Sequence, residues 1–284
     1  MNKRHDMKDK PAIVIPLDGS ITATAALGAA QAVANIIEGV LHIVHATETP
    51  LSEDQLLKTL NIDSLQVKCF VLHQIGGDAV DAILKFALNI DARMIVMSSH
   101  GHTYNPQHVV GGTAIGIIQH AAMPVMVIRP GIQKLPDVSW TPARMLLPLE
   151  GAPEVAAVEQ IFSLAKLIEV DVDVLHIVFV GAEQPSEAGA LTSPKYIDYP
   201  QYDWPAWAEE FINRFGAHRP LEVKLRLFHR EGRPGDVMLE FALENNEDLI
   251  ALSWHGHLEK ERAAVVKGIL QRTELPILLM RSEE

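Results

Sequence analysis

The stretch MIVMSSHGHTYNPQHVVGGTAIGIIQHAAMPVMVIR, residues 94–129, decides the fold. Its opening run, 94–97, is short and apolar like a buried strand, and residues 112–122 carry apolar side chains at helical spacing. Pro124 ends that helix, and residues 125–128 have the pattern of another strand. A strand, a loop, a helix and a strand in this order predict a parallel α/β unit.

Glycines stand where this strand gives way to this helix. Gly111, Gly112 and Thr113 open the helix, where unpaired N–H groups and a partial positive charge favour an anion and glycine lets a phosphate approach the backbone. A tight connection without a ligand explains the same residues. Both interpretations stay open at this point, because isolated glycine spacings also match by accident.

The chain before this stretch alternates in the same way. Strands are predicted there at 12–17, 40–46 and 65–74 and helices at 21–37, 52–60 and 79–89, the last capped by Asp78; a fourth strand, 93–98, leads into the stretch itself. After a proline-rich linker, 133–142, the pattern starts again. RMLLPL at 144–149 matches AIVIPL at 12–17, VLHIV at 174–178 is identical to 40–44, and SWHGH at 253–257 echoes SSHGH at 98–102. The chain is therefore predicted to hold two copies of one domain, 1–132 and 143–284.

The second copy departs from the first at its loop. Counted back from Pro276, Ala263 and Ala264 replace the glycine pair, and glutamates occupy positions 259 and 261. Carboxylates repel a polyphosphate, so we expect no nucleotide at this loop.

Four segments in combination resemble the universal stress protein family, present here as a tandem. They are IVIPLDGS at 13–20, GDAVDAILKFA at 77–87, MIVMSSHGH at 94–102 and GGTAIGIIQHAAMPVMVIR at 111–129. The resemblance implies an α/β fold of two Rossmann-like (adenine nucleotide alpha hydrolase-like) domains. Each would have a five-stranded parallel sheet of order 3-2-1-4-5 with helices on both faces, the copies packing as an internal pseudo-dimer. Family members that bind ATP hold it at the carboxyl ends of the strands.

The resemblance also implies site residues in the first copy. Asp18 matches the family acid that binds the nucleotide, although an N-cap for the following helix is an equal alternative. Ala46 ends the second strand, where backbone meets the adenine. Gly101 and Gly111 match the first and third loop glycines, and Gly112 or Thr113 takes the hydroxyl position. In the second copy Glu150 replaces the acid.

The loop between Gly101 and Gly111 has nine residues where the family pattern has twelve, and Tyr104 stands in place of the second glycine. The ligand of this loop therefore remains open. It could be ATP or a shorter adenine nucleotide such as AMP or ADP, with or without Mg²⁺, or the loop could bind no ligand at all.

Composition bounds the remaining classes. With 24 basic and 36 acidic residues the net charge is −12, which argues against nucleic acid and anionic membranes. No apolar run spans a bilayer and no secretion signal is recognisable, so we expect a cytoplasmic protein. The single cysteine, Cys69, lies in an apolar run and is predicted to be a buried structural thiol.

Two further features have competing interpretations. The HxH pairs at 100–102 and 255–257 could bind zinc with His73, His108, His120 or His229, or be ordinary polar loop residues. The aromatic insertion Tyr196 to Trp207 suits either a recognition surface or a loop folded over an apolar crevice at the second cleft or the domain interface.

No P-loop, nucleophile elbow or HExxH motif occurs, and no acid/base pair stands out. The predicted function is therefore a stress-response regulatory or binding module with an adenine-nucleotide site in the first copy. A structural or interaction protein without nucleotide is the alternative, and a weak ATPase is the third. Protein partners are not specified by the sequence, and a further homodimer is possible.

Overall fold

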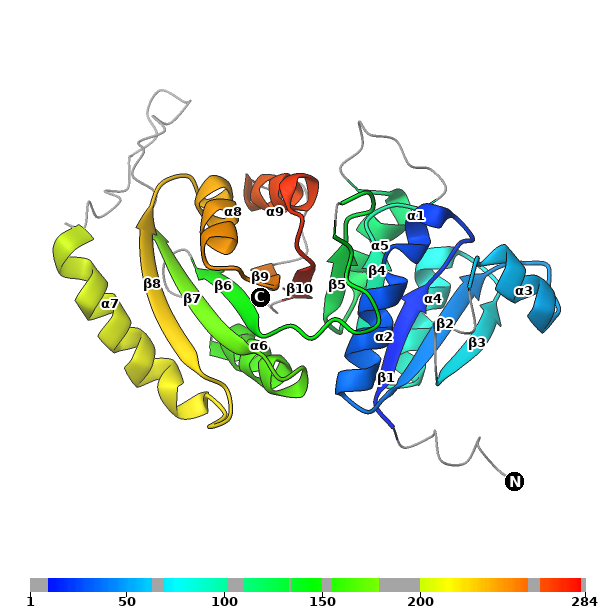
Figure 1. Ribbon diagram of the computed structural model, residues 1–284, viewed down its shortest axis with the longest axis horizontal. Helices are drawn as coiled ribbons and strands as arrows, with labels where there is room; N and C mark the ends of the chain where they lie inside the picture. The colour runs from blue at the N-terminus through cyan, green and yellow to red at the C-terminus, as the bar shows by residue number, and fades with distance from the viewer. Residues whose placement is uncertain are drawn as a thin grey trace.

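The computed structural model describes residues 10–62, 69–101, 110–132, 134–149, 155–178, 200–254 and 261–281 of the chain. These residues form two α/β domains that lie side by side (Figure 1). The first domain runs in the order β1 (Ala12–Pro16), α1 (Ile21–Thr24), α2 (Leu27–Ile36), β2 (Val40–Ala46), α3 (Glu53–Thr59), β3 (Phe70–Ile75), α4 (Ala79–Asn89), β4 (Ala92–Ser98), α5 (Gly112–His120) and β5 (Val125–Ile128).

The second domain repeats this order. Its elements are β6 (Arg144–Leu149), α6 (Val155–Leu167), β7 (Asp171–Val178), α7 (Pro200–Phe215) with a 3-10 turn (Gly216–His218), β8 (Leu225–Glu231), α8 (Pro234–Glu244), β9 (Leu249–Trp254), α9 (Glu261–Arg272) and β10 (Ile277–Arg281). Among the described residues, no helix has both the length and the apolar character needed to cross a membrane.

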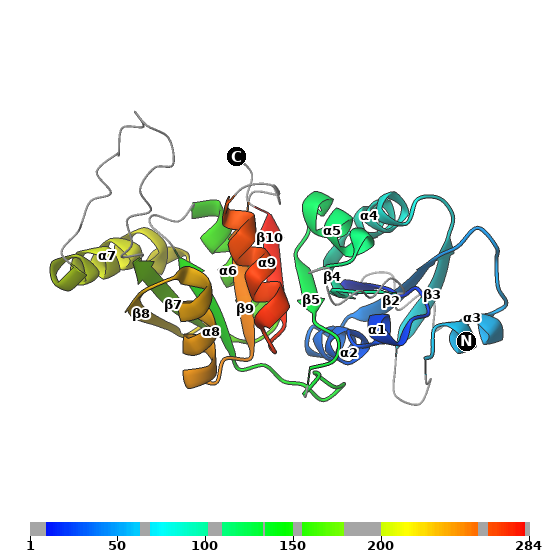
Figure 2. The same cartoon turned by 90° about the horizontal axis from the view of Figure 1, so that it is seen from above.

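The strands form one sheet in the order β3-β2-β1-β4-β5-β10-β9-β6-β7-β8. Each half has the predicted order 3-2-1-4-5 and parallel pairing, so the predicted fold is confirmed. The halves join through β5 and β10, which pair antiparallel with Met126 opposite Leu278. Figure 2 shows these two strands meeting between the domains, where each would otherwise be an exposed edge.

Helices cover both faces of this sheet. One buried apolar cluster packs α2, α3, α6 and α7 against the strands, and a second packs α4, α5, α8 and α9. Each cluster contains strand residues of both domains. Because β1 and β4 are covered on both sides, their sequences are nearly continuous apolar runs, as the prediction of buried parallel strands required.

The cap predicted at Asp78 is confirmed. The Asp78 side chain accepts hydrogen bonds from Val80 N and Asp81 N, and Ser52 and Gln55 form a reciprocal capping box on α3. The prediction of a single helix over residues 21–37 was wrong. The segment divides into α1 and α2, since Ala25 N and Ala26 N bond three residues back and the Thr24 hydroxyl bonds Ile21 O, which tightens this turn.

The structure corrects one detail of the repeat. Both first strands pair in matching registers, with Ala12 opposite Val40 and Arg144 opposite Asp171. Because AIVIPL and RMLLPL correspond, position 42 corresponds to 173, and His45, not His42, corresponds to His176. The identical VLHIV segments therefore lie three residues apart in the fold. Their side chains alternate in the opposite sense across the sheet, as an odd shift requires.

The connection between β5 and β6 is tied to both domains. It crosses α2 at Gly28, where a Cβ would lie only 2.1 Å from Pro136 O. The Asn35 side chain donates to Val138 O, and Trp140 packs on the first apolar cluster. Glycine at position 28 is what allows the two backbones to approach.

Candidate functional site

The loops that follow β1 and β4 bring two predicted site residues into contact. β1 and β4 are neighbours in the sheet, so Asp18 and Gly101 emerge beside each other. A Cβ built on Gly101 would lie 2.1 Å from Asp18 Oδ2. The carboxylate therefore rests against the Gly101 backbone, and any larger residue at 101 must displace it.

Asp18 is held by the residues that start α1. Its Oδ1 accepts from Ser20 N at 2.9 Å and from the Ser20 hydroxyl at 2.6 Å. Ser20 Oγ in turn accepts from Ala23 N and is the N-cap of α1. The alternative that Asp18 caps this helix was wrong; Asp18 orients the cap instead.

Two residues that the sequence analysis did not single out complete this corner. The Thr22 hydroxyl donates to Gly101 O at 2.9 Å, which fixes α1 to the end of β4. His45 Nδ1 contacts Leu17 O at 2.8 Å and ties the end of β2 to the residue before Asp18. The position of each at a strand or helix end was visible in the sequence, but their partners depend on which strands are adjacent.

The start of α5, with Gly111, Gly112 and Thr113, lies beside the loops that follow β1 and β4. Gly111 N donates to Ser99 O at 2.8 Å, and a Cβ on Gly111 would lie 4.0 Å from Gly101 N, so the two glycines are close. Gly111 is the N-cap of α5 and makes no side-chain cap bond, and no acidic residue lies in the first turn. A Cβ on Gly112 would meet no described atom within 4 Å. Among the described residues, no atom fills the space beside Gly112 in the first turn of α5, where the helix start favours an anion.

Ala46 is placed less directly. It is the last residue of β2 and lies opposite Ile75 of β3, while Thr47 N continues the ladder to Ile75 O. β2 is bonded to the β1 end through Leu17 N and Val44 O. The strand end is next to the Asp18 loop, but no contact between Ala46 and Asp18 is among those described.

The equivalent loops of the second domain lie largely outside the described residues. Glu150 and residues 255–260 fall there, as do His102, His108, His255 and His257. In the described part of the chain, no group of three His, Cys, Asp or Glu side chains is placed to hold a metal. His100 is buried, with its Nδ1 2.9 Å from the Ser99 hydroxyl.

The aromatic insertion is a helix where it is described. Residues 196–199 lie outside the described part, and α7 starts at Pro200. Trp207 stacks on His176 with ring centroids 4.2 Å apart and on Phe211 at 5.1 Å. The prediction of a loop over a crevice was therefore wrong for this part: the rings of Trp204 and Trp207 belong to the packed face of α7.

Cys69 was also predicted wrongly. The thiol is exposed, and the residue has a φ of +54° at the turn before β3. The apolar run that suggested burial belongs to β3, an edge strand that starts one residue later.

Comparison with known proteins identifies the family. A model of the universal stress protein family matches residues 47–129 and again 143–281. The chain belongs to the universal stress protein family. Among curated proteins, none matches the sequence significantly.

Solved structures agree with a tandem universal stress protein fold. A universal stress protein of Archaeoglobus fulgidus DSM 4304 is 16% identical with a TM-score of 0.59, covering 96% of this chain and 97% of its own. A functionally unknown protein of Pseudomonas aeruginosa PAO1 is 12% identical with a TM-score of 0.64, covering 98% and 94%. At these identities the likeness concerns the fold alone.

Proposed function

We propose that the first domain of this universal stress protein binds an adenine nucleotide at the carboxyl ends of β1, β2 and β4, and that occupancy regulates a surface read by partner proteins. The observation that carries the proposal is the meeting of Asp18, Gly101 and Gly111 beside the uncapped first turn of α5.

Each residue has a role in this proposal. Backbone N–H groups of Gly112 and Thr113 and the Thr113 hydroxyl would hold phosphate, since glycine allows close approach and the helix start carries partial positive charge. Asp18 would accept from a hydroxyl or amine of the nucleoside, and backbone near Ala46 would face the base. Mg²⁺ would accompany only a polyphosphate. The domain boundaries 1–132 and 143–284 and a cytoplasmic location are part of the proposal.

Calorimetric titration with ATP, ADP and AMP, after removal and mass-spectrometric identification of any co-purified nucleotide, tests the proposal. We expect about one site per chain. Gly101→Ala should weaken binding at least about tenfold, because its Cβ displaces Asp18 and a charge-assisted hydrogen bond contributes roughly 1.5–3 kcal/mol. The double change Gly112→Ala with Thr113→Val should weaken binding as well.

Gly235→Ala is the matched control. Gly235 lies in the first turn of α8, and a Cβ there meets no described atom within 4 Å, as at Gly112. Its affinity should equal that of the wild type. The short loop between Gly101 and Gly111 favours the rival, an interaction protein; absence of binding at millimolar nucleotide would establish that rival.

A further inference from the structure

The turn between α8 and β9 buries an acidic side chain beside another one. Glu247 is 4% exposed, and Asp173 of β7 is fully buried next to it. Arg226 of β8 holds the Asp173 carboxylate through two hydrogen bonds, one of 2.7 Å from Nε. Among the described residues, neither carboxylate oxygen of Glu247 has a hydrogen-bond donor. Arg226 thus compensates one of the two carboxyl groups directly.

A buried carboxylate without a donor is costly, so Glu247 keeps its proton. Burial raises the pKa of the Glu247 carboxyl to about 9, and hydrogen bonding to Asp173 and the Asp173 charge act in the same direction. Arg144 of β6 and Arg226 of β8 oppose the rise. In this state the protonated Glu247 can donate to Asp173, and the two acids do not repel each other.

The same turn fastens the connection between the domains. Asp248, the next residue, accepts at Oδ2 from Ala143 N at 2.7 Å and from Arg144 N at 3.0 Å. The Arg144 guanidinium donates to Asn245 O at 2.7 Å. Residues 245–248 therefore clamp the end of the connecting segment onto the second domain, and a movement of Glu247 out of the interior would carry Asp248 with it.

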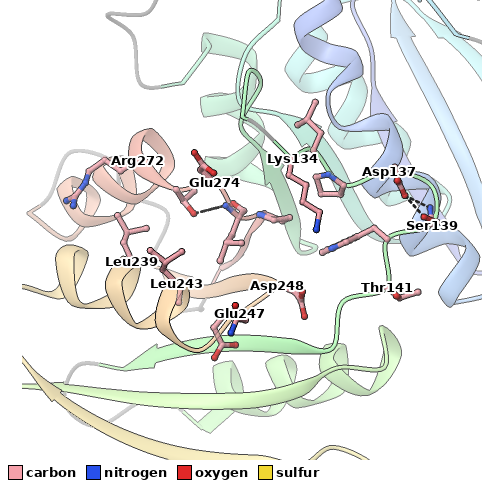
Figure 3. A pocket seen from close by; sticks show the side chains of 18 residues that line it. Lys134, Asp137, Ser139, Thr141, Leu239, Leu243, Glu247, Asp248, Arg272 and Glu274 are labelled. Atoms are coloured by element: carbon pink, nitrogen blue, oxygen red, sulfur yellow. Dashed lines mark hydrogen bonds between the residues drawn. The ribbon is translucent and has the colours of Figure 1, made fainter.

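This clamp borders a cavity. A volume of about 870 Å³ lies between the connecting segment, the end of α8 and the turn before β10. Figure 3 shows Glu247 and Asp248 below it, with Lys134 entering from the connecting segment and Glu274 at the opposite rim. Release of the clamp would change the shape of this cavity and the hold of the second domain on the connection.

The first domain has no such device. By register, Ala92 stands at the position of Glu247 and Arg93 at that of Asp248. Pro11 corresponds to Ala143, since each accepts at its carbonyl from the first residue of the next strand, and proline has no N–H to donate. The acid and its clamp belong to the second copy alone.

We propose that loss of the proton on Glu247 opens the turn between α8 and β9 and releases the start of β6, so that the second domain carries an alkaline-sensitive clamp at the point where the connecting segment enters it. The charged group must reach water, and Asp248 then loses Ala143 and Arg144. The proposal is independent of nucleotide binding in the first domain.

Amide hydrogen exchange of the full chain between pH 5 and 10, corrected for intrinsic exchange, measures the clamp. A group that binds its proton near pH 9 when closed and near pH 4.3 when open makes opening up to about tenfold more favourable per pH unit between those values. The protection of the Ala143 and Arg144 amides should fall accordingly, while amides in the centre of β7 keep theirs. Glu247→Gln retains a donor for Asp173 and has no proton to lose, so its protection should not change with pH.

Glu274→Gln is the matched control, because it removes an exposed carboxylate from the rim of the same cavity. It should behave like the wild type. Equal pH dependence in wild type and Glu247→Gln would overturn the proposal, and so would the same dependence at the β7 amides, which indicates global unfolding. If Glu247→Gln does not fold, carbon-13 NMR of the wild-type side-chain carboxyls decides: a Glu247 midpoint below about pH 6 overturns the proposal, and one near pH 9 supports it.

Discussion

The two domains place different side chains at the equivalent position between the outer strands and the helix that packs on them, α4 in the first domain and α8 in the second. In the first domain His42 of β2 and His73 of β3 stack, with Nδ1 and Nε2 3.0 Å apart and ring centroids 5.1 Å apart. Phe86 of α4 lies over His73 at 4.5 Å. Burial, and then the neighbouring His73, lowers the pKa of His42 to about 4. This cluster is neutral at pH 7.

The second domain places a charged cluster there. Register puts Asp173 at the position of His42 and Arg226 at that of Val71. Phe228 meets Phe241 of α8 edge to face at 4.9 Å, which retains an aromatic contact between strand and helix. The aromatic contact is therefore shared, whereas the polar partners and Glu247 are particular to the second copy.

The difference shows what the scaffold fixes and what it leaves free. The sheet order, the turns and the helix–strand contact are common, because the backbone hydrogen bonds and apolar faces of both copies demand them. The buried polar side chains need only hydrogen-bond partners among themselves. The paired imidazoles meet this need in the first domain, and the ion pair with a protonated acid beside it does so in the second. The two clusters therefore differ in their response to pH.

Removal of the cation of the second cluster should have the largest effect. Arg226→Met leaves Asp173 buried without its two hydrogen bonds and next to Glu247. Removing one member of a buried pair costs about 3–5 kcal/mol, and because the Arg226 side chain is 48% exposed we expect a smaller loss, roughly 2–3 kcal/mol. Denaturant unfolding followed by tryptophan fluorescence measures it, since all four tryptophans lie after residue 132.

Val71→Met is its counterpart in the first domain. The side chain there is partly exposed and no buried charge depends on it, so a change within about 0.5 kcal/mol is expected. A loss at Val71 as large as that at Arg226 would show that the outer strand, and not the ion pair, determines the result.

Acid should destabilise the first domain through its histidine pair. The folded pKa of His42 is about 4 and the unfolded one 6.5, so the unfolded chain binds the proton more tightly. The stability that the neutral histidine pair contributes is present in full above pH 6.5 and is lost as the pH falls toward 4. Full linkage is about 3 kcal/mol, and partial exposure of the ring reduces it to roughly 2. His42→Leu should flatten this dependence.

Amide exchange in β1 and β2 between pH 4 and 7 provides the measurement, because the first domain contains no tryptophan. His120→Gln changes an exposed histidine whose Nδ1 contacts Gly116 O, and it should leave the slope unaltered. An unchanged slope in His42→Leu would contradict the assignment. The second domain should share the acid response, since burial and His229 lower the pKa of His176 to about 4, whereas alkaline sensitivity is expected of it alone.

The sequence was sufficient for the fold because alternation of strands and helices, Pro124 and the cap Asp78 are local signals. It was insufficient for the register of β7, since five identical residues do not determine pairing. The better signal was the turn before each strand, where Glu38 and Glu169 both have positive φ and occupy equivalent positions. That turn, and not VLHIV, aligns the copies.

The site was predictable to the same depth. Gly111 was chosen from a helix start, and Asp18 and Gly101 from the resemblance to the family; the structure brings the three together. Thr22 and His45 were missed because a hydroxyl or imidazole at an element end has no signature without its partner across the sheet. The antiparallel joint of β5 and β10 was missed because nothing local distinguishes an edge that pairs from one that is exposed.

The smallest effect is expected at the residue before β3, where the copies also differ. Cys69 is exposed with φ +54°, whereas its counterpart Lys224 donates its N–H to Asp171 Oδ1 and has no positive φ. Cys69→Gly should stabilise by about 0.5 kcal/mol through relief of the left-handed backbone, and Lys224→Gly should destabilise by about 1 kcal/mol. In the folded wild type a maleimide should label Cys69 at nearly the rate of a free thiol, and slow labelling together with a loss of stability in Cys69→Gly would restore the buried structural thiol that the sequence suggested.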